Sequence, residues 1–159
     1  MPADFDLRAV HAALDARRAA LGASWAAVGA ELGVSAGTLR TLGTRRAAEG
    51  DGVLRALAWL GRSPESFVAG DVAENRLPVT AVGALRFDTR ALYAALEAAR
   101  AARGLTWPEV AAGSGVARAA SLTRLRAGGR VMFPEVMGVL AWLGAPAARF
   151  VRTSRQAGA

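Results

Sequence analysis

Arginine side chains are the residues in this chain whose type and placement point most directly to a chemistry. All 20 basic residues are arginine and the formal net charge is +7. Residues 1–70 hold 8 arginines against 7 acids, whereas residues 71–159 hold 12 against 6. One acid-free segment of the second half carries Arg118, Arg124, Arg126 and Arg130. Mutational bias would explain arginine in place of lysine but not this placement. A patch of a single sign attracts polyanions, most commonly a phosphate backbone.

Groups suited to covalent or metal chemistry are scarce. The chain has no cysteine and no lysine, and His11 is its only histidine. These absences exclude a disulfide or thiolate metal site, a Walker phosphate loop and a lysine Schiff base. The glycines are scattered at turns and form no phosphate-cradling loop after a strand, and no nucleophile is paired with a base. We therefore predict a protein that is not an enzyme and that needs no cofactor or metal.

A helix–turn–helix pattern organises the chain around these arginines. Residues Ser24–Leu42 predict a short helix, a tight turn at Gly33 and a second short helix capped by Ser35. Glycine takes a positive φ without strain, and serine is a good N-cap, so both residues suit these positions. The pattern returns at Thr106–Leu125 with one inserted residue.

Other segments repeat as well, which indicates an internal duplication. VLRALAWLG at 53–61 matches VMGVLAWLG at 136–144, an offset of 83 residues. Asp6 and Asp88 each follow a phenylalanine and can cap a first helix, at an offset of 82. We predict an all-α fold of two tandem helix-turn-helix domains with four to five helices each. The predicted parts are a first domain at 1–68, a linker that tethers the domains at 69–84, a second domain at 85–152 and a disordered tail at 153–159.

The sequence shows neither a signal-peptide pattern nor a membrane-spanning segment. Its first residues, MPADFDLRAV, lack the pattern of a signal peptide. The longest weakly polar run, 136–148, is interrupted by Pro146 and is too short to span a bilayer. We expect a cytoplasmic, nucleoid-associated protein.

These patterns resemble the lambda-repressor-like (Cro or XRE type) helix-turn-helix family of DNA-binding domains. VGAELGVSAGTL in the first half resembles the consensus core of the family. RLRAGGRVMFPEVMGVLAWLG in the second half resembles the exit from the third helix and the fourth helix. The resemblance implies that the third helix of each domain docks in the major groove, with its N-terminal residues at base edges.

The resemblance also assigns roles to individual side chains. Base contacts are implied for Thr38, Arg40, Thr41, Arg118, Ser121, Thr123 and Arg124. Backbone contacts are implied for Ser24, Trp25, Ser35, Arg45, Arg46, Thr106, Trp107, Arg126 and Arg130. An arginine early in such a helix can bond O6 and N7 of guanine, worth about 1–3 kcal/mol of discrimination. This makes Arg118 the leading candidate, whereas Arg40 lies a turn further in and reaches either a base or a phosphate.

Three departures from the family pattern affect these assignments. Trp25 and Trp107 stand where the family usually has glutamine, so each indole either donates to a phosphate or belongs to the core. Ala36 and Gly37 offer no hydrogen-bonding side chain, which leaves the third helix of the first domain poor in groups that can read bases. The residue inserted in the second half either shifts the third helix or lengthens the turn before it.

The leading hypothesis is a sequence-specific, double-stranded DNA-binding transcriptional regulator, a repressor of the phage-immunity or mobile-element type. One chain would read an asymmetric operator with two major-groove recognition helices. Neither a membrane nor a small-molecule ligand is expected as a partner, and the pattern is compatible with a monomer or a dimer. The alternative is a degenerate helix-turn-helix module or adaptor that binds a protein through its tryptophans or the apolar linker residues. The sequence leaves open whether the half-sites are direct or inverted.

Overall fold

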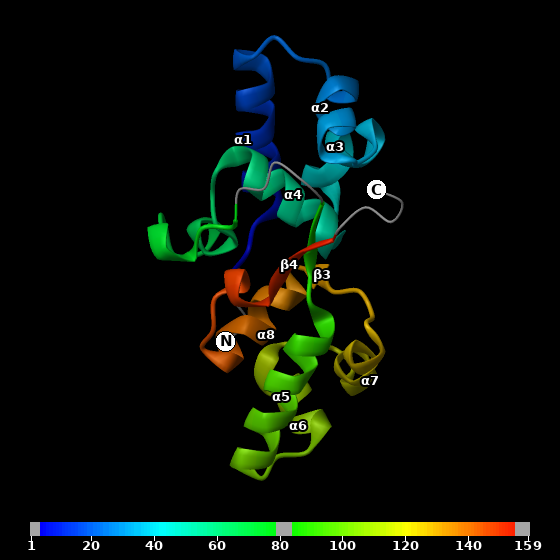
Figure 1. The fold of residues 1–159 in the computed structure, drawn as a ribbon, viewed down its shortest axis with the longest axis vertical. Coiled ribbons are helices and arrows are strands. Elements are labelled where there is room, and N and C mark those ends of the chain that lie inside the picture. Colours follow the sequence, from blue (N-terminus) through cyan, green and yellow to red (C-terminus); the bar gives the residue numbers. More distant parts are fainter. Residues whose placement is uncertain (1–3, 79–83, 155–159) are drawn as a thin grey trace.

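Two similar helical halves lie at opposite ends of an elongated molecule in the computed structural model, which describes residues 4–78 and 84–154 (Figure 1). The first half comprises α1 (Leu7–Ala20), α2 (Trp25–Leu32), α3 (Ala36–Thr41), the 3-10 helix η1 (Leu42–Thr44), strand β1 (Ala48–Glu49), α4 (Gly50–Leu60) and η2 (Pro64–Phe67). The second half repeats this order with α5 (Thr89–Arg103), α6 (Trp107–Ser114), α7 (Ala119–Thr123), η4 (Arg124–Ala127), β3 (Met132–Phe133), α8 (Glu135–Leu143) and η5 (Ala147–Phe150). The remaining elements are η3 (Ala73–Asn75), β2 (Ala84–Phe87) and β4 (Val151–Ser154).

Side-chain caps set the starts of the first helix in both halves. The Asp6 carboxylate accepts a hydrogen bond from the Arg8 N–H at 2.8 Å, and Asp88 accepts one from the Ala91 N–H at 3.0 Å. Each bond satisfies an amide that has no partner within the first turn of the helix. The predicted caps at these two positions are therefore confirmed.

The fold is mixed, which corrects the prediction of an all-α protein. Besides the eight α-helices, the described residues form two small antiparallel sheets, one from β1 and β3 and the other from β2 and β4. The strands are only two to four residues long. Such short segments show no detectable period-2 alternation, so sequence patterns do not reveal them.

The strands also alter the predicted linker and tail. Ala84, placed in the linker, begins β2, and Leu77 from the same segment is buried at 6% exposure. Thr153 and Ser154, placed in the disordered tail, belong to β4. Residues 79–83 and 155–159 lie outside the described part of the chain, so the rest of these two predictions stays untested.

The sheet formed by β1 and β3 joins the two halves. Ala48 pairs with Phe133, and Glu49 pairs with Met132. Phe133 is fully buried, and its ring lies 4.8 Å from that of Phe5 between centroids. Buried residues from both halves form one continuous hydrophobic cluster. The halves are thus parts of one packed body, and not two domains held by a tether alone.

This strand pairing is symmetric under exchange of the two halves. With the offset of 83 residues that aligns α4 with α8, Glu49 is equivalent to Met132, so this pair maps onto itself. The same offset makes Ala48 equivalent to Val131 and Gly50 equivalent to Phe133. The Gly50 N–H donates to the Val131 carbonyl at 2.8 Å, so this contact is the counterpart of the Ala48–Phe133 pair. A local two-fold axis therefore passes through the Glu49–Met132 pair, as at the isologous interface of a two-fold dimer.

Polar contacts tie the halves together around this axis. The Asp51 carboxylate on α4 accepts from the Phe87 N–H on β2 at 2.8 Å. The Glu65 carboxylate on η2 accepts from the Ala147 N–H on η5 at 2.7 Å. These buried or half-buried bonds, added to the shared core, fix the position of one half relative to the other.

Candidate nucleic-acid interface

The helix–turn–helix of the first half is closely packed. Gly33 ends α2 with φ +69°, a left-handed conformation that favours glycine. A Cβ on Gly29 would lie only 2.4 Å from the Val34 carbonyl oxygen, so α2 and the turn approach too closely for a larger residue. Ser35 caps α3 by accepting from the Thr38 N–H at 3.1 Å. These contacts hold α3 at a fixed angle to α2.

The second half has a longer turn at the same place. Gly115 ends α6 with φ +76°, and α7 begins only after Arg118, its N-cap residue. In the first half the N-cap Ser35 stands two positions after the turn glycine, whereas Arg118 stands three positions after it. The inserted residue therefore lengthens the turn. Arg118 lies in extended backbone just before the helix, not within it as predicted, and its side chain makes no cap bond.

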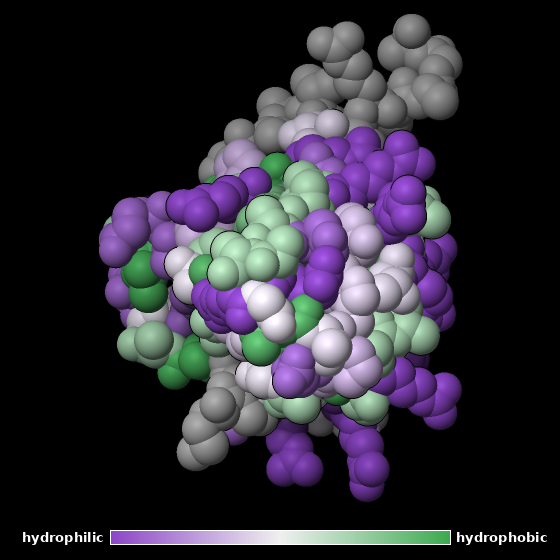
Figure 2. Space-filling view, turned by 90° about the horizontal axis from the view of Figure 1, so that it is seen from below, coloured by the Kyte–Doolittle hydropathy of each residue, from purple (hydrophilic) through white to green (hydrophobic). Residues whose placement is uncertain are grey.

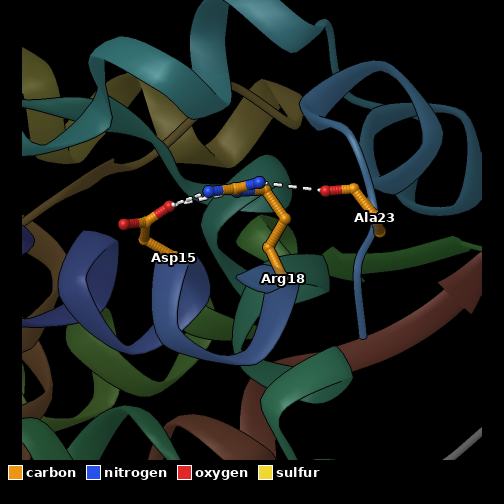
Figure 3. Close-up of polar contacts among 3 residues, drawn as sticks. All are labelled: Asp15, Arg18 and Ala23. Atoms are coloured by element: carbon orange, nitrogen blue, oxygen red, sulfur yellow. Dashed lines mark hydrogen bonds and ion pairs between the residues drawn. The ribbon is translucent and has the colours of Figure 1, made fainter. Parts of the chain in front are cut away.

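An arginine fixes the connection between the first two helices of each half. In the first half Arg18 bonds the Asp15 carboxylate at 2.6 Å and the Ala23 carbonyl at 3.0 Å (Figure 3). Its guanidinium also lies over the ring of Trp25, 4.9 Å from the centroid, and His11 stacks on Trp25 at 5.5 Å. Trp25 is therefore half-buried against α1.

The second half repeats this arrangement with different residues. Arg100 bonds Glu97 at 2.6 Å and the Leu105 carbonyl at 2.9 Å. Its guanidinium lies 5.3 Å from the centroid of Trp107, on which Tyr93 stacks at 5.4 Å. Both tryptophans thus pack onto the first helix of their half and stay partly exposed, and the donation from either indole to a phosphate remains a prediction.

The hydroxyl groups at the predicted helix starts are used within the protein. Ser24 accepts from the Ala27 N–H at 3.0 Å, which caps α2. The Thr106 hydroxyl bonds the Glu109 carboxylate at 2.9 Å, and the two residues form a capping box on α6. A phosphate at either position would have to share these groups.

The outward polar residues of α3 include one arginine without a hydrogen bond to the described chain. Thr38 accepts a hydrogen bond from the Ser35 hydroxyl at 2.7 Å, and the Thr41 hydroxyl donates to the Gly37 carbonyl at 2.8 Å. Arg40 is exposed and makes no hydrogen bond or ion pair with any described residue. Arg40 is therefore the group on α3 best placed to bind an external ligand.

The helix α7 has an exposed arginine at each end. Arg118 and Arg124 flank α7, and both are exposed without a hydrogen bond or an ion pair to the described residues. Ser121 is half-buried, and the Thr123 hydroxyl donates to the Ala120 carbonyl at 3.3 Å. Arg118 and Arg124 are the exposed cations at this helix, and the Ser121 hydroxyl likewise makes no hydrogen bond with a described residue.

The loops after α3 and α7 add further exposed arginines. Arg45 makes one long contact, 3.4 Å from its Nε to the Thr41 hydroxyl. Arg46, Arg126 and Arg130 are exposed, and none of them forms a hydrogen bond or an ion pair with a described residue. All four predicted loop cations can therefore reach a partner outside the protein.

Exposed arginines that the sequence patterns missed lie on other elements. Arg86 is on β2, Arg90 is in the first turn of α5 and Arg152 is on β4. Arg86 and Arg152 are direct partners in the ladder between β2 and β4. No signal in the sequence marks that pairing, because both strands escape detection.

α3 and α7 lie on the same side of the long axis, at the right in Figure 1. They are counterparts in the repeat, and the strand pairing between the two halves is symmetric about the Glu49–Met132 pair. Figure 2 views the molecule along its length from the second half, and hydrophilic side chains project from much of its rim.

Comparison of the chain with protein-family models, curated proteins and solved structures finds no match. None of the helices in the described ranges is long and apolar enough to cross a membrane. Across 4–78 and 84–154, no group of three or more His, Cys, Asp or Glu side chains could hold a metal ion.

Proposed function

We propose that the protein is a sequence-specific, double-stranded DNA-binding regulator that acts as a repressor from the cytoplasm. The observation that carries the proposal is the placement of α3 and α7 on one side of a single packed body. Each of them stands beside exposed arginines that form no hydrogen bond or ion pair with the described residues. The arrangement matches the general geometry in which paired recognition helices enter successive major grooves.

The two halves contribute unequally to this function. Arg118 and Arg124 at α7 reach base edges, where an arginine pairs best with guanine. On α3 Arg40 is the one free cation, so the first half anchors the complex mainly through Arg40, Arg45 and Arg46 to phosphates. A two-fold relation between unlike helices calls for inverted half-sites of unlike sequence, and hence for an asymmetric operator.

The alternative of a protein-interaction module receives less support. A docking surface for a protein partner is usually a contiguous apolar patch. The large hydrophobic residues that are exposed in the described chain are Leu21, Val68 and Met132. They belong to separate elements, which argues against one apolar docking face.

Selection of bound duplexes from a random pool tests the proposal. We expect an enriched site with two unlike, inverted half-sites about 34–36 Å apart, one turn of DNA. Fluorescence anisotropy with that duplex should show an affinity that falls steeply with salt, because bound arginines release counterions from phosphates. Absence of enrichment, or an affinity independent of salt, would reject DNA binding in favour of the adaptor.

A further inference from the structure

A cleft of about 850 Å³ opens between the two halves. One wall consists of the turn before α3, α3 itself and the first turns of α4. The other consists of β2, the start of α5, the loop 127–131 and Arg152 of β4. A smaller hollow beside α7 shares Arg130 and Val131 with the lining of the cleft.

The second wall of the cleft is rich in unpartnered cations. Arg86, Arg90, Arg130 and Arg152 are exposed, and none forms a hydrogen bond or an ion pair with a described residue. Arg86 and Arg152 stand directly opposite each other in the ladder. Like charges at such positions destabilise a sheet unless a counter-charge lies between them.

The acids that line the same cleft do not supply this counter-charge in full. Glu49 accepts from two amides at the start of α4, at 3.0 Å each. Asp51 accepts from the Phe87 N–H, and Asp88 caps α5. Each carboxylate is thus engaged by backbone N–H groups, and Asp51 also interacts electrostatically with Arg86 and Arg55. The carboxylates keep their charge in these bonds, but the cleft is lined by five arginines against three acids, so positive charge remains in excess.

We infer that this cleft binds the backbone phosphates of the duplex segment between the two half-sites. The inference rests on the proposed function, because DNA that spans the two halves passes the cleft that opens between them. Guanidinium groups bind phosphate oxygens through charge-assisted hydrogen bonds.

The contact is one-sided. The repeat places Asp4 at the position of Arg86 and Ala69 at that of Arg152, so the first half lacks these two cations. Of the two strands in the spacer, the strand nearer β2 and β4 is therefore held more tightly. This asymmetry separates the cleft from the recognition helices, which are present in both halves.

The full-length double variant Arg86→Ala/Arg152→Ala tests the inference. Its affinity for the selected duplex should fall at least about tenfold, and the salt slope should decrease by about 1.8, since each lost phosphate contact removes about 0.9. A short duplex that carries only the second half-site should bind the variant and the wild type equally. The matched control is Arg76→Ala/Arg149→Ala, which removes the same charge from exposed positions outside the cleft. Circular dichroism and thermal melting should show that both double variants are folded.

Different outcomes separate this inference from the proposed function. An unchanged affinity and slope for the duplex, or an equal loss in the control, would overturn the cleft contact and leave DNA binding intact. No binding of any duplex by the wild type would overturn both.

Titration with inorganic triphosphate tests a small polyanion as the occupant. Triphosphate binding that is lost in the double variant, with duplex affinity unchanged, would assign the cleft to a small phosphorylated ligand and reject the spacer. Hydroxyl-radical footprinting should show protection of one spacer strand that disappears in the double variant.

Discussion

Phe133 of the second half packs on Phe5 of the first, with ring centroids 4.8 Å apart and the Phe133 side chain fully buried. Phe87, the repeat counterpart of Phe5, also packs on the Phe133 ring, with the two ring centroids 5.8 Å apart. One aromatic side chain therefore fills the space between the first segments of both halves. A chain in which two domains were merely tethered would have no such residue.

We predict that Phe133→Ala destabilises the whole molecule. Removal of a fully buried phenylalanine costs about 3–5 kcal/mol, from lost burial and from the cavity left behind. Because the core is shared, urea unfolding followed by fluorescence and by circular dichroism should give one coincident transition at a lower midpoint. Met132→Ala, one residue away and 39% exposed, is the control and should have a small effect. Two separate transitions in the wild type would contradict the shared core.

Glycine substitutions in the first helix–turn–helix should have opposite signs. Gly29→Ala places a Cβ 2.4 Å from the Val34 carbonyl oxygen, and backbone must shift to accept it. Gly37→Ala in α3 meets no atom within 4 Å and should stabilise the helix by roughly 0.5–1 kcal/mol. Differential scanning calorimetry of the two variants measures both shifts. A Gly29→Ala variant as stable as the wild type would show that the turn is looser than the structure describes.

Helices and caps could be predicted from the sequence because their signals are local. Asp6, Asp88 and Ser35 each cap a helix from within three residues, and Gly33 marks its turn by backbone conformation alone. The order of elements in the two halves follows from those signals and from the repeat.

The sheets and the cleft could not be predicted, because they depend on partners distant in the sequence. β1 has only two residues, and its pairing with β3 is set by the packing of the two halves. Arg86 and Arg152 become neighbours only through the pairing of β2 with β4. The insertion before Arg118 was visible, but its effect on the turn needed the backbone.

Asp51 should make the stability of the fold depend on pH. Burial raises the pKa of this carboxyl above its ordinary value of 3.8, and Glu49 raises it further, while the Phe87 N–H, Arg86 and Arg55 act in the opposite direction. Because the pKa of Asp51 is higher in the folded than in the unfolded protein, the protonated carboxyl stabilises the fold. This stabilisation is fully present below pH 3.8 and is lost as pH rises through the folded-state pKa. The contribution of Asp51 to wild-type stability should therefore decline over that interval.

Two substitutions isolate this effect in urea unfolding at several pH values. Asp51→Asn keeps an oxygen that can accept from the Phe87 N–H but cannot ionise, so its stability should lack that decline. Asp51→Ala leaves the amide without its partner and should cost about 1–3 kcal/mol at every pH. Parallel pH profiles for the wild type and Asp51→Asn would show that burial does not shift this carboxyl.

Arg118 should affect base selectivity more than overall affinity for DNA. Its side chain is exposed, has no partner among the described residues and stands at the start of α7, where recognition helices meet base edges. Arg118→Ala should weaken binding to the selected duplex by about 1–3 kcal/mol and relax one base position. Arg118→Lys keeps the charge but loses the bidentate fork, so it should relax the same position while the salt slope stays near that of the wild type.

Arg46→Ala, in the loop after α3, should instead weaken binding to all duplexes alike and lower the salt slope by about 0.9. Repeating the random-pool selection with each variant measures these differences. An unaltered base preference in both Arg118 variants would move base recognition away from this residue.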